Sequence, residues 1–592
     1  MERREIVICD LAEACRESER LSGVTAKDRW EIVRYETAER SGTGIIASPR
    51  TMPQQLTLDP GLRGWYRIYL AMAAEDGMNG IELRLDGDDF SEIVRPCDIS
   101  RHINWNSFEM IEESYWKAAD MTGKSLCIMK PEKHFSYTAS LMWIRFVPAE
   151  EEEVRQDTAA KTMYAHMDED FMWMDPLDPT NIRDYLRPIR RMRESDVEVI
   201  AQEVTNDLCD RISGLKPEES VTRRSRGEDV FDRIRLERAR HLTGNREAVI
   251  REETEYAHRY GMRFFAAHRM ALSNFGFPFS GESNRIGFVA EHPEFSCVSR
   301  DGKRLAFLSY AFPEVQDYMI AQLRKTAEYG VDGVTLIFTR GPWIMYEKPV
   351  RDLFAERYGE AADLRRLPSG DRRACEIRCA VMTGFMRRLR GEMDSVGKRR
   401  GKRVEIYVTS YTAAEDIQKD GLDVETLARE GLIDGVIQSN MTVWEETDDV
   451  LGEDGLIDLE KYRKKAESRF IVKRAHANEI ERILRGLPTY RRIAGTYGIR
   501  LWSEIQWENS AEPEDYAADA KRIYENGGTG IALWDAYPKR VTRLSEWYVT
   551  SRLGSPEHIG ELNRGNTPYR RLIKILSWNG EDMSLYNPSW RG

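Results

Sequence analysis

The sequence predicts an α/β protein in which a (β/α)8 barrel follows an antiparallel β-sandwich. After about residue 150, eight short apolar runs alternate with segments of helical periodicity over about 390 residues, enough for a closed parallel barrel with long loops. Before that point, short strands with a two-residue alternation are separated by Asp, Gly and Pro turns. No long amphipathic helix interrupts these early strands, which favours a sandwich over a mixed fold.

Four segments of the first 150 residues are typical of strands in an antiparallel sandwich. They are Gly64–Leu70, Gly80–Leu85, Ser125–Met129 and Leu141–Val147. The last of them leads through Pro148 into a run of four glutamates, which has the composition of a charged linker. We therefore expect an accessory sandwich over residues 1–150 and a barrel with a C-terminal extension over residues 151–592.

The eight barrel strands are expected at the apolar runs that follow this linker. They are Thr162–His166, Val197–Val204, Met262–His268, Gly333–Thr339, Val404–Thr409, Gly435–Gln438, Ile499–Ile505 and Gly530–Trp534. Several begin directly after a turn that ends a helix, such as Asp332-Gly333 and Asp434-Gly435. The sixth strand and the highly charged stretch 206–246 carry the weakest patterns.

Helices between these strands are marked by proline in a first turn and by an apolar stripe. Pro313 opens one helix, whose stripe includes Val315, Met319 and Leu323, and Pro513 opens another. A doubly wound open sheet is the rival fold. It is disfavoured because no glycine-rich dinucleotide or phosphate motif follows any of the strands.

Composition and charge exclude several classes of function. The net charge of -12 argues against nucleic acid as a partner, since phosphate binding needs a basic face. The N-terminus has no apolar signal segment, and no apolar run approaches 18 residues, so we expect a cytoplasmic protein without a membrane partner. A homo-oligomer stays open at this point.

Metal, cofactor and serine chemistry find no support in the motifs. The eight cysteines form no C-x-x-C pair, and Cys375 and Cys379 have the spacing of helix packing. Zinc motifs such as H-E-x-x-H and the G-x-S-x-G elbow of serine hydrolases are both missing. We expect no metal and no cofactor.

Polar and aromatic side chains gather where the predicted strands end, the face on which barrel enzymes place their chemistry. Carboxylates and indole rings together suit a carbohydrate, because sugars offer hydroxyl groups for hydrogen bonds and apolar faces for stacking. Hydrolysis of a glycosidic bond needs two carboxyl groups, one on each side of the bond. The expected substrate-binding residues are Asp207, His268, Arg269, Arg340, Trp343, Trp502, Trp534 and Asp535.

The carboxylates also have structural interpretations. Glu504 stands in an otherwise buried strand, where a charge is either functional or paired. Asp535 also suits a helix cap, and Glu347 also suits the first turn of a helix near Pro349. Of Glu203 and Asp207 only one should face the barrel interior, and we favour Asp207 because it lies further toward the loop.

A longer motif resembles a known family. His292-Pro293-Glu294-Phe295, Arg300-Asp301-Gly302 and the segment Leu308–Tyr318 precede Val331-Asp332-Gly333. This order, with Tyr346-Glu347 and the closing Gly528–Asp535, resembles the glycosyl-hydrolase-like family 10 group of bacterial barrel proteins. The resemblance covers roughly residues 160–550 and implies a barrel glycosidase. The segment before residue 150 resembles the jelly-roll accessory domains of such barrels.

The fourth strand departs from this family pattern. It reads Thr335–Arg340 and contains no acid, whereas related barrels often have one there. The larger clan of retaining barrel glycosidases has its acid at the end of strand four and its nucleophile at the end of strand seven. By this resemblance Glu504 would be the nucleophile or base and Glu347 the acid. Their carboxyl groups should then lie about 5–5.5 Å apart in a retaining enzyme or about 6.5–9.5 Å apart in an inverting one.

The sequence thus predicts a glycoside hydrolase that acts on an oligosaccharide or glycoside through two carboxyl groups. Two alternatives remain. The missing acid on strand four favours a carbohydrate-binding protein on a barrel that has lost its activity. A barrel lyase or isomerase would be favoured by a phosphate or metal site after strands seven and eight, and the sequence has no glycine-rich loop there.

Overall fold

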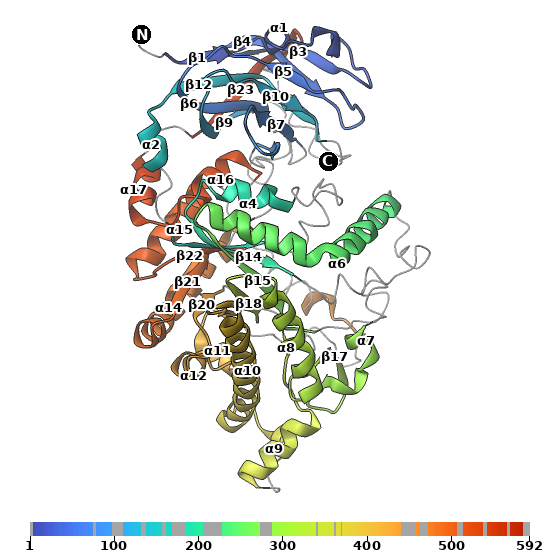
Figure 1. Ribbon diagram of the computed structural model, residues 1–592, viewed down its shortest axis with the longest axis vertical. Coiled ribbons are helices and arrows are strands. Elements are labelled where there is room, and N and C mark those ends of the chain that lie inside the picture. The colour runs from blue at the N-terminus through green and yellow to red at the C-terminus, as the bar shows by residue number, and fades with distance from the viewer. Residues whose placement is uncertain are drawn as a thin grey trace.

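The structure is a computed structural model of the 592-residue chain. It describes all residues except 1–3, 75–78, 97–109, 132–137, 157–160, 168–184, 205–227, 273–286, 339–340, 360–362, 369, 440–455, 462–471, 506–512, 535, 537–541, 565–568 and 584–592. Figure 1 shows two parts, a β-rich part at the top of the view and the barrel with its helices below it.

The β-rich part consists of a large antiparallel sheet and a small one. The large sheet has the order β1 (Ile6–Ile8), β12 (Trp143–Pro148), β6 (Trp65–Ala73), β9 (Met110–Asp120), β23 (Arg570–Trp578), β3 (Trp30–Thr37), β4 (Ser41–Ala47) and β11 (Ala139–Leu141), with β2 (Leu21–Ser22) beside β3 and β24 (Glu581–Asp582) beside β23. The small sheet has the order β5 (Leu56–Leu58), β10 (Leu126–Met129), β7 (Ile81–Leu85) and β8 (Glu92–Val94). The expected N-terminal sandwich is therefore confirmed.

The C-terminal extension returns to this sandwich. Strand β23 pairs with β9 on one side and with β3 on the other, so it lies in the middle of the large sheet. In Figure 1 it is the red strand among blue ones. Residues 570–578, which the expected boundaries 1–150 and 151–592 assign to the second part, therefore lie in the sheet of the first part.

The barrel is closed and parallel, as expected. Its strands are β13 (Met163–Met167), β14 (Val197–Glu203), β15 (Arg263–Arg269), β18 (Gly333–Ile337), β19 (Glu405–Ser410), β20 (Gly435–Gln438), β21 (Arg500–Ile505) and β22 (Ile531–Leu533). Strand β22 pairs with β13 through Tyr164 and Ala532, which closes the ring. Every strand lies at the apolar run expected for it.

Helices cover the outside of the barrel. They are α4 (Arg187–Met192), α6 (Glu228–Arg259), α8 (Pro313–Glu328), α9 (Lys348–Tyr358), α10 (Arg372–Arg400), α11 (Ala414–Lys419), α12 (Val424–Arg429), α14 (Val472–Tyr497), α15 (Pro513–Glu525), α16 (Leu544–Thr550) and α17 (Pro556–Arg564). Shorter elements are α1 (Leu11–Ala14), the linker helix α2 (Glu151–Gln156), α7 (Phe288–Glu291) and the hairpin of β16 (Ser296–Val298) and β17 (Arg304–Leu308). Helix α8 buries Val315, Met319 and Leu323, the stripe that the sequence predicts. Among the described helices, none is long and apolar enough to span a membrane.

Four aromatic rings fill the barrel interior toward the amino-terminal ends of its strands. Tyr164, Phe265, Tyr407 and Trp502 come from alternate strands, the usual layering of a (β/α)8 core. The Tyr407 ring lies 4.4 Å from Phe265 and 5.1 Å from Trp502, centroid to centroid. Glycines on the intervening strands make room for them: a Cβ on Gly333 would lie 2.3 Å from the Phe265 ring. The layer closes the barrel interior toward the amino-terminal ends of the strands, so a ligand in the interior would lie on its other side.

Aspartates fix the amino-terminal rim of the barrel. Asp332 precedes β18, and its carboxylate accepts the backbone N–H of Phe264 on β15 at 2.9 Å. Asp434 precedes β20 and accepts the N–H of Ile406 on β19 at the same distance. The Asp-Gly pairs noted in the sequence are therefore structural: the aspartate joins two strands, and the glycine leaves space for the aromatic layer.

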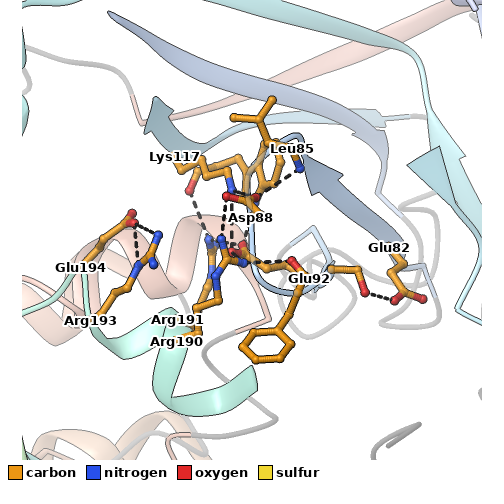
Figure 2. A network of polar contacts seen from close by, with 12 residues as sticks. Glu82, Leu85, Asp88, Glu92, Lys117, Arg190, Arg191, Arg193 and Glu194 are labelled. Atoms are coloured by element: carbon orange, nitrogen blue, oxygen red, sulfur yellow. Dashed lines mark hydrogen bonds and ion pairs between the residues drawn. The ribbon is translucent and has the colours of Figure 1, made fainter. Parts of the chain in front are cut away.

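A buried ionic network joins the sandwich to the barrel (Figure 2). Arg190 on α4 bonds Glu92 of β8 at 2.5 Å and Asp88 at 2.8 Å. Arg191 bonds the other oxygen of Glu92 at 3.0 Å, and Lys117 of β9 bonds Asp88 at 2.5 Å. Burial alone would raise the pKa of Glu92, but Lys117, Arg191 and Arg190 outweigh it and hold that pKa well below its usual value.

Candidate functional site

Polar side chains from β21 and from the consecutive strands β13, β14 and β15 face the barrel interior above the aromatic layer. Alternation along each strand puts His166 two residues after Tyr164, Glu203 two after Ala201, Arg269 two after Ala267 and Glu504 two after Trp502. The earlier residue of each pair lies in the interior cluster, so the later one faces the same interior closer to the carboxyl-terminal end. This is the end at which barrel enzymes carry out their chemistry.

Glu203 is the centre of the contacts in this group. Its Oε1 accepts a hydrogen bond of 2.6 Å from Nε of Arg269 on the next strand. Its Oε2 lies 3.9 Å from Nε2 of His166 on the preceding strand. The His166 ring stacks on Trp534, with 3.8 Å between centroids and 11° between planes. One side chain from each of β13, β14 and β15 and the residue that follows β22 therefore form a connected cluster.

Glu504 stands on β21, beyond Trp502 and above the aromatic layer. Its residue is 5% exposed and Glu203 is 1% exposed, so both carboxyl groups lie inside the barrel rather than on its surface. Glu203 and Glu504 are the two acids of the described residues that face the interior near the carboxyl ends of strands. Both acids therefore lie at the end of the interior where barrel enzymes carry out their chemistry.

His268, an expected substrate ligand, faces away from this interior. Its Nε2 and Oγ1 of Thr326 on α8 share a hydrogen bond of 3.0 Å, so the imidazole packs between β15 and the helix layer. Burial, with a smaller contribution from Arg246, lowers the pKa of His268 to about 3. The one-residue step from Arg269 to His268 reverses the direction of the side chain, and His268 is a neutral histidine of the core.

Two of the three expected stacking residues are enclosed in the core. Trp502 is part of the aromatic layer, and its Nε1 donates to the carbonyl of Thr162 at the amino-terminal end of β13. Trp343 packs edge-on against Phe338 at 5.2 Å and is 1% exposed. Only Trp534, which is partly exposed, combines an available ring with a place beside the acidic cluster.

Glu347, the expected acid, lies at the start of α9 and is fully buried. Its Oε1 accepts the backbone N–H of Val298 at 3.0 Å, and its Oε2 accepts that of Met345 at 2.9 Å. Burial raises the pKa of Glu347 against the opposing effect of these amide bonds. The contacts link the loop after β18 to the hairpin of β16 and β17, an arrangement that favours a structural anchor over a catalytic acid.

Three expected substrate ligands, Asp207, Arg340 and Asp535, lie outside the described residues. Of the pair Glu203 and Asp207, the structure therefore describes Glu203 alone, and it faces inward. Within the part of the chain that is described, no group of three or more His, Cys, Asp or Glu side chains has the arrangement of a metal site.

No family model matches the chain, and no curated protein matches it. Solved structures do match. The glycoside hydrolase domain of PelA from Pseudomonas aeruginosa is 11% identical, over 64% of this chain and 96% of that one, with a TM-score of 0.29. The α-L-fucosidase isoenzyme 2 from Paenibacillus thiaminolyticus is 12% identical over 69% of this chain and 50% of that one, with a TM-score of 0.36. TtGalA, an α-galactosidase from Thermus thermophilus, is 12% identical over 90% of this chain and 94% of that one, with a TM-score of 0.31. The family resemblance thus stays a prediction.

Sequence reasoning passed over His166 and Glu203 as primary candidates. Both signals were present, because each is the final inward position of a predicted strand when counted in steps of two from an interior residue. Counting from the strand end, rather than preferring the residue nearest the loop, would have selected Glu203. Arg269, Glu504 and Trp534 were expected, and they lie at this end of the interior.

Proposed function

We propose that this protein is a glycoside hydrolase whose two carboxyl groups are Glu504 and Glu203. The observation that carries the proposal is the placement of these acids, with Arg269, His166 and Trp534, around the upper interior of a closed barrel. Cleavage of a glycosidic bond needs one carboxyl group that donates a proton and a second that is ionised. Glu203 replaces Glu347 in the pair expected from the sequence.

The neighbours of Glu203 assign the roles of the two acids. Glu203 bonds the Arg269 guanidinium, and an ionised carboxylate is the form that a guanidinium binds most strongly. Glu504 is the second buried acid at this end of the interior, so the role of proton donor falls to it. We therefore assign Glu203 as the nucleophile or base and Glu504 as the proton donor, the reverse of the role that the resemblance implies for Glu504.

The remaining members of the cluster have supporting roles. Trp534 offers a partly exposed ring face for a sugar, while its other face holds His166. Arg269, with a side chain 23% exposed, orients Glu203 and brings a positive charge to the site. The aromatic layer below excludes water from the lower barrel.

The test is turnover of a panel of aryl glycosides and oligosaccharides by the full chain and by Glu203→Gln, Glu504→Gln and Glu347→Gln. We expect each of the first two to lower kcat by about 10³-fold, the scale of losing an acid or base catalyst. Glu347→Gln should lower the melting temperature and keep most of kcat. Retained turnover in either of the first two variants would remove that residue from the mechanism.

Azide separates the roles of the two acids. With an activated aryl glycoside, azide should restore turnover of Glu203→Ala by replacing the lost nucleophile, if the enzyme is retaining. Activity of Glu504→Gln should recover with good leaving groups, which need no proton. Wild-type protein that binds sugars and turns over no member of the panel would instead support a carbohydrate-binding barrel.

A further inference from the structure

A cleft of about 400 Å³ lies between the sandwich and the barrel, apart from the proposed active site. Strand β9 forms one wall, and helices α4 and α16 with the linker helix α2 form the other. Arg193 and Glu194, on its barrel side, precede the amino-terminal end of β14, whereas the acidic cluster lies toward the carboxyl-terminal ends of the strands. The cleft therefore opens on a different part of the molecule, with a volume in the range of small-molecule pockets.

Partly exposed aromatic rings line this cleft from both sides. Trp65 and Tyr115 come from the sandwich, and Tyr548 comes from α16. The rings of Tyr115 and Tyr548 meet edge to face at 5.2 Å, and Tyr548 stacks in parallel on Tyr569 at 4.8 Å. Rings held by their neighbours in this way give rigid apolar surfaces at little entropic cost, as sugar stacking requires.

Positive charge predominates among the polar side chains of the cleft. The basic residues are Lys117, Lys124, Arg191, Arg193 and Arg552, and the acidic residues are Asp88, Asp120 and Glu194, an excess of two positive charges. Glu92 behind the wall reduces the local excess to one. The Arg552 guanidinium lies 4.0 Å above the Tyr548 ring, so a cation stands directly beside an aromatic face.

Both kinds of group fit one class of ligand. We propose that this cleft binds an acidic saccharide, an oligosaccharide that contains a uronic acid. A sugar ring stacks on Trp65, because Tyr569 and Arg552 cover the two faces of Tyr548, and the carboxylate of the ligand meets Arg552 and Lys124. Asp120 and Glu194 accept hydroxyl hydrogens and repel polyphosphates, which favours a saccharide with one charge per ring over a nucleotide. The cleft binds the oligosaccharide through a sugar unit that the barrel does not cleave. This binding is therefore independent of the proposed hydrolysis.

The test is calorimetric titration of the full chain carrying Glu504→Gln with trigalacturonate, and with neutral maltotriose as comparison. We expect trigalacturonate to bind and maltotriose to bind at least tenfold more weakly. Trp65→Ala with Lys124→Gln should raise the Kd of trigalacturonate at least tenfold. Tyr358→Ala with Lys303→Gln is the matched control, because both of these residues lie on the barrel side away from the cleft lining, and its Kd should not change.

Several results would overturn this proposal. They are an absence of trigalacturonate binding, equal binding of maltotriose, or an unchanged Kd in the cleft variant. If Trp65→Ala unfolds the protein, Lys124→Gln alone, at a partly exposed side chain, keeps the test decisive through a Kd raised at least threefold. Turnover of an aryl glycoside by the cleft variant in an otherwise native chain should equal that of the wild type, so failure of this site and failure of the proposed active site give different results.

Discussion

Asp332 and Glu253 are both fully buried carboxyl groups, and their neighbours give them opposite states of charge. Asp332 bonds Lys402, and its Oδ2 lies 2.8 Å from Nε2 of His258. Burial would raise the pKa of Asp332, but Lys402 and His258 outweigh it and lower that pKa. Glu253 on α6 has Gln202 as its hydrogen-bonding neighbour, and burial raises the pKa of Glu253 well above its usual value. The surroundings of Glu253 therefore favour its neutral form, whereas those of Asp332 favour its charged form.

Asp332→Asn should destabilise the fold without changing the proposed chemistry. The amide keeps the shape of the carboxylate but loses its charge, so the bonds from Lys402 and from the Phe264 amide weaken by about 2–3 kcal/mol together. Urea unfolding measures this loss. Asp301→Asn, on an exposed loop, is the control and should change stability by less than about 0.5 kcal/mol. A loss of kcat in correctly folded Asp332→Asn would contradict a purely structural role.

Glu253→Gln should stabilise the protein at neutral pH. Because the folded pKa is raised, the contribution of this acid to stability is complete below its unfolded pKa near 4.5 and is lost as pH rises toward the folded pKa. Glutamine has no such loss, so the stability of the variant relative to the wild type should rise from pH 4 to pH 8. Melting temperatures of wild type and variant across that range, beside the exposed control Glu255→Gln, decide the matter. Parallel curves would show that Glu253 does not titrate differently in the folded state.

At the scale of elements, the aromatic layer depends on glycines in the adjacent strands. Gly333 and Gly435 each begin a strand and face the rings of Phe265 and Tyr407. A Cβ on Gly333 would also lie 2.6 Å from the carbonyl oxygen of Glu405, which is main chain and cannot turn aside. The four rings and their glycines thus form one packing unit across six strands.

Gly333→Ala should therefore cost about 1–3 kcal/mol, the usual range for overpacking a core. Gly384→Ala is a matched control, because Gly384 lies within helix α10, where an added Cβ would meet no neighbouring group within 4 Å. That control should gain about 0.5–1 kcal/mol from helix propensity. Chemical unfolding of both variants gives the comparison. Equal effects in the two would mean that the barrel interior adjusts freely around an added methyl group.

Elements with a regular apolar pattern were predictable from the sequence. Strand β9, whose pattern is interrupted by buried charges, was not. All eight barrel strands lie within two residues of their expected bounds at each end, because parallel strands are continuous apolar runs. The sequence pattern does not indicate strand β9, since Glu112, Glu113 and Lys117 interrupt its apolar residues. These charges are buried: Glu113 accepts hydrogen bonds from the Trp143 indole at 2.6 Å and from Arg145 at 3.0 Å. The partners that permit such burial are distant in sequence.

The candidate site was predictable in part, because the predicted strands also show where their carboxyl ends lie. Glu504, Arg269 and Trp534 follow from the rule that chemistry gathers at the carboxyl ends of strands. The rule does not give the facing of a side chain, which changes with a single residue, and so His268 was included. Nor does it identify a carboxylate that accepts a backbone N–H from a distant hairpin, as Glu347 does from Val298.

At the scale of the whole molecule, the ionic network of Figure 2 fixes the sandwich against the barrel. Glu92 alone accepts bonds from Arg190 and Arg191 on α4 and from the Trp116 indole on β9. Charges removed from water in this way are costly unless each is paired, so the two parts are complementary in charge as well as in shape. The cleft next to this network owes its position to the same contacts.

Glu92→Gln should destabilise the chain at neutral pH by about 3–5 kcal/mol, because it removes the counterion of Arg191 and one of the two counterions of the buried Arg190. The folded pKa of Glu92 is lowered, so its contribution is present above the unfolded pKa near 4.5 and declines as pH falls below that value. Wild type and variant should therefore differ most at pH 7 and converge in acid. Calorimetric melting curves test this, with Glu194→Gln, an exposed acid of the same region, as control. A difference that does not change with pH would contradict the lowered pKa.

Strand β23 has a consequence for the order in which the protein is made. A ribosome produces the sandwich first, yet the central position between β9 and β3 stays empty until residues 570–578 emerge, after the whole barrel. Two long strand edges are therefore exposed throughout synthesis of the barrel, and such edges promote aggregation. Chaperone binding to nascent chains should concentrate on this interval and end when the last strand inserts.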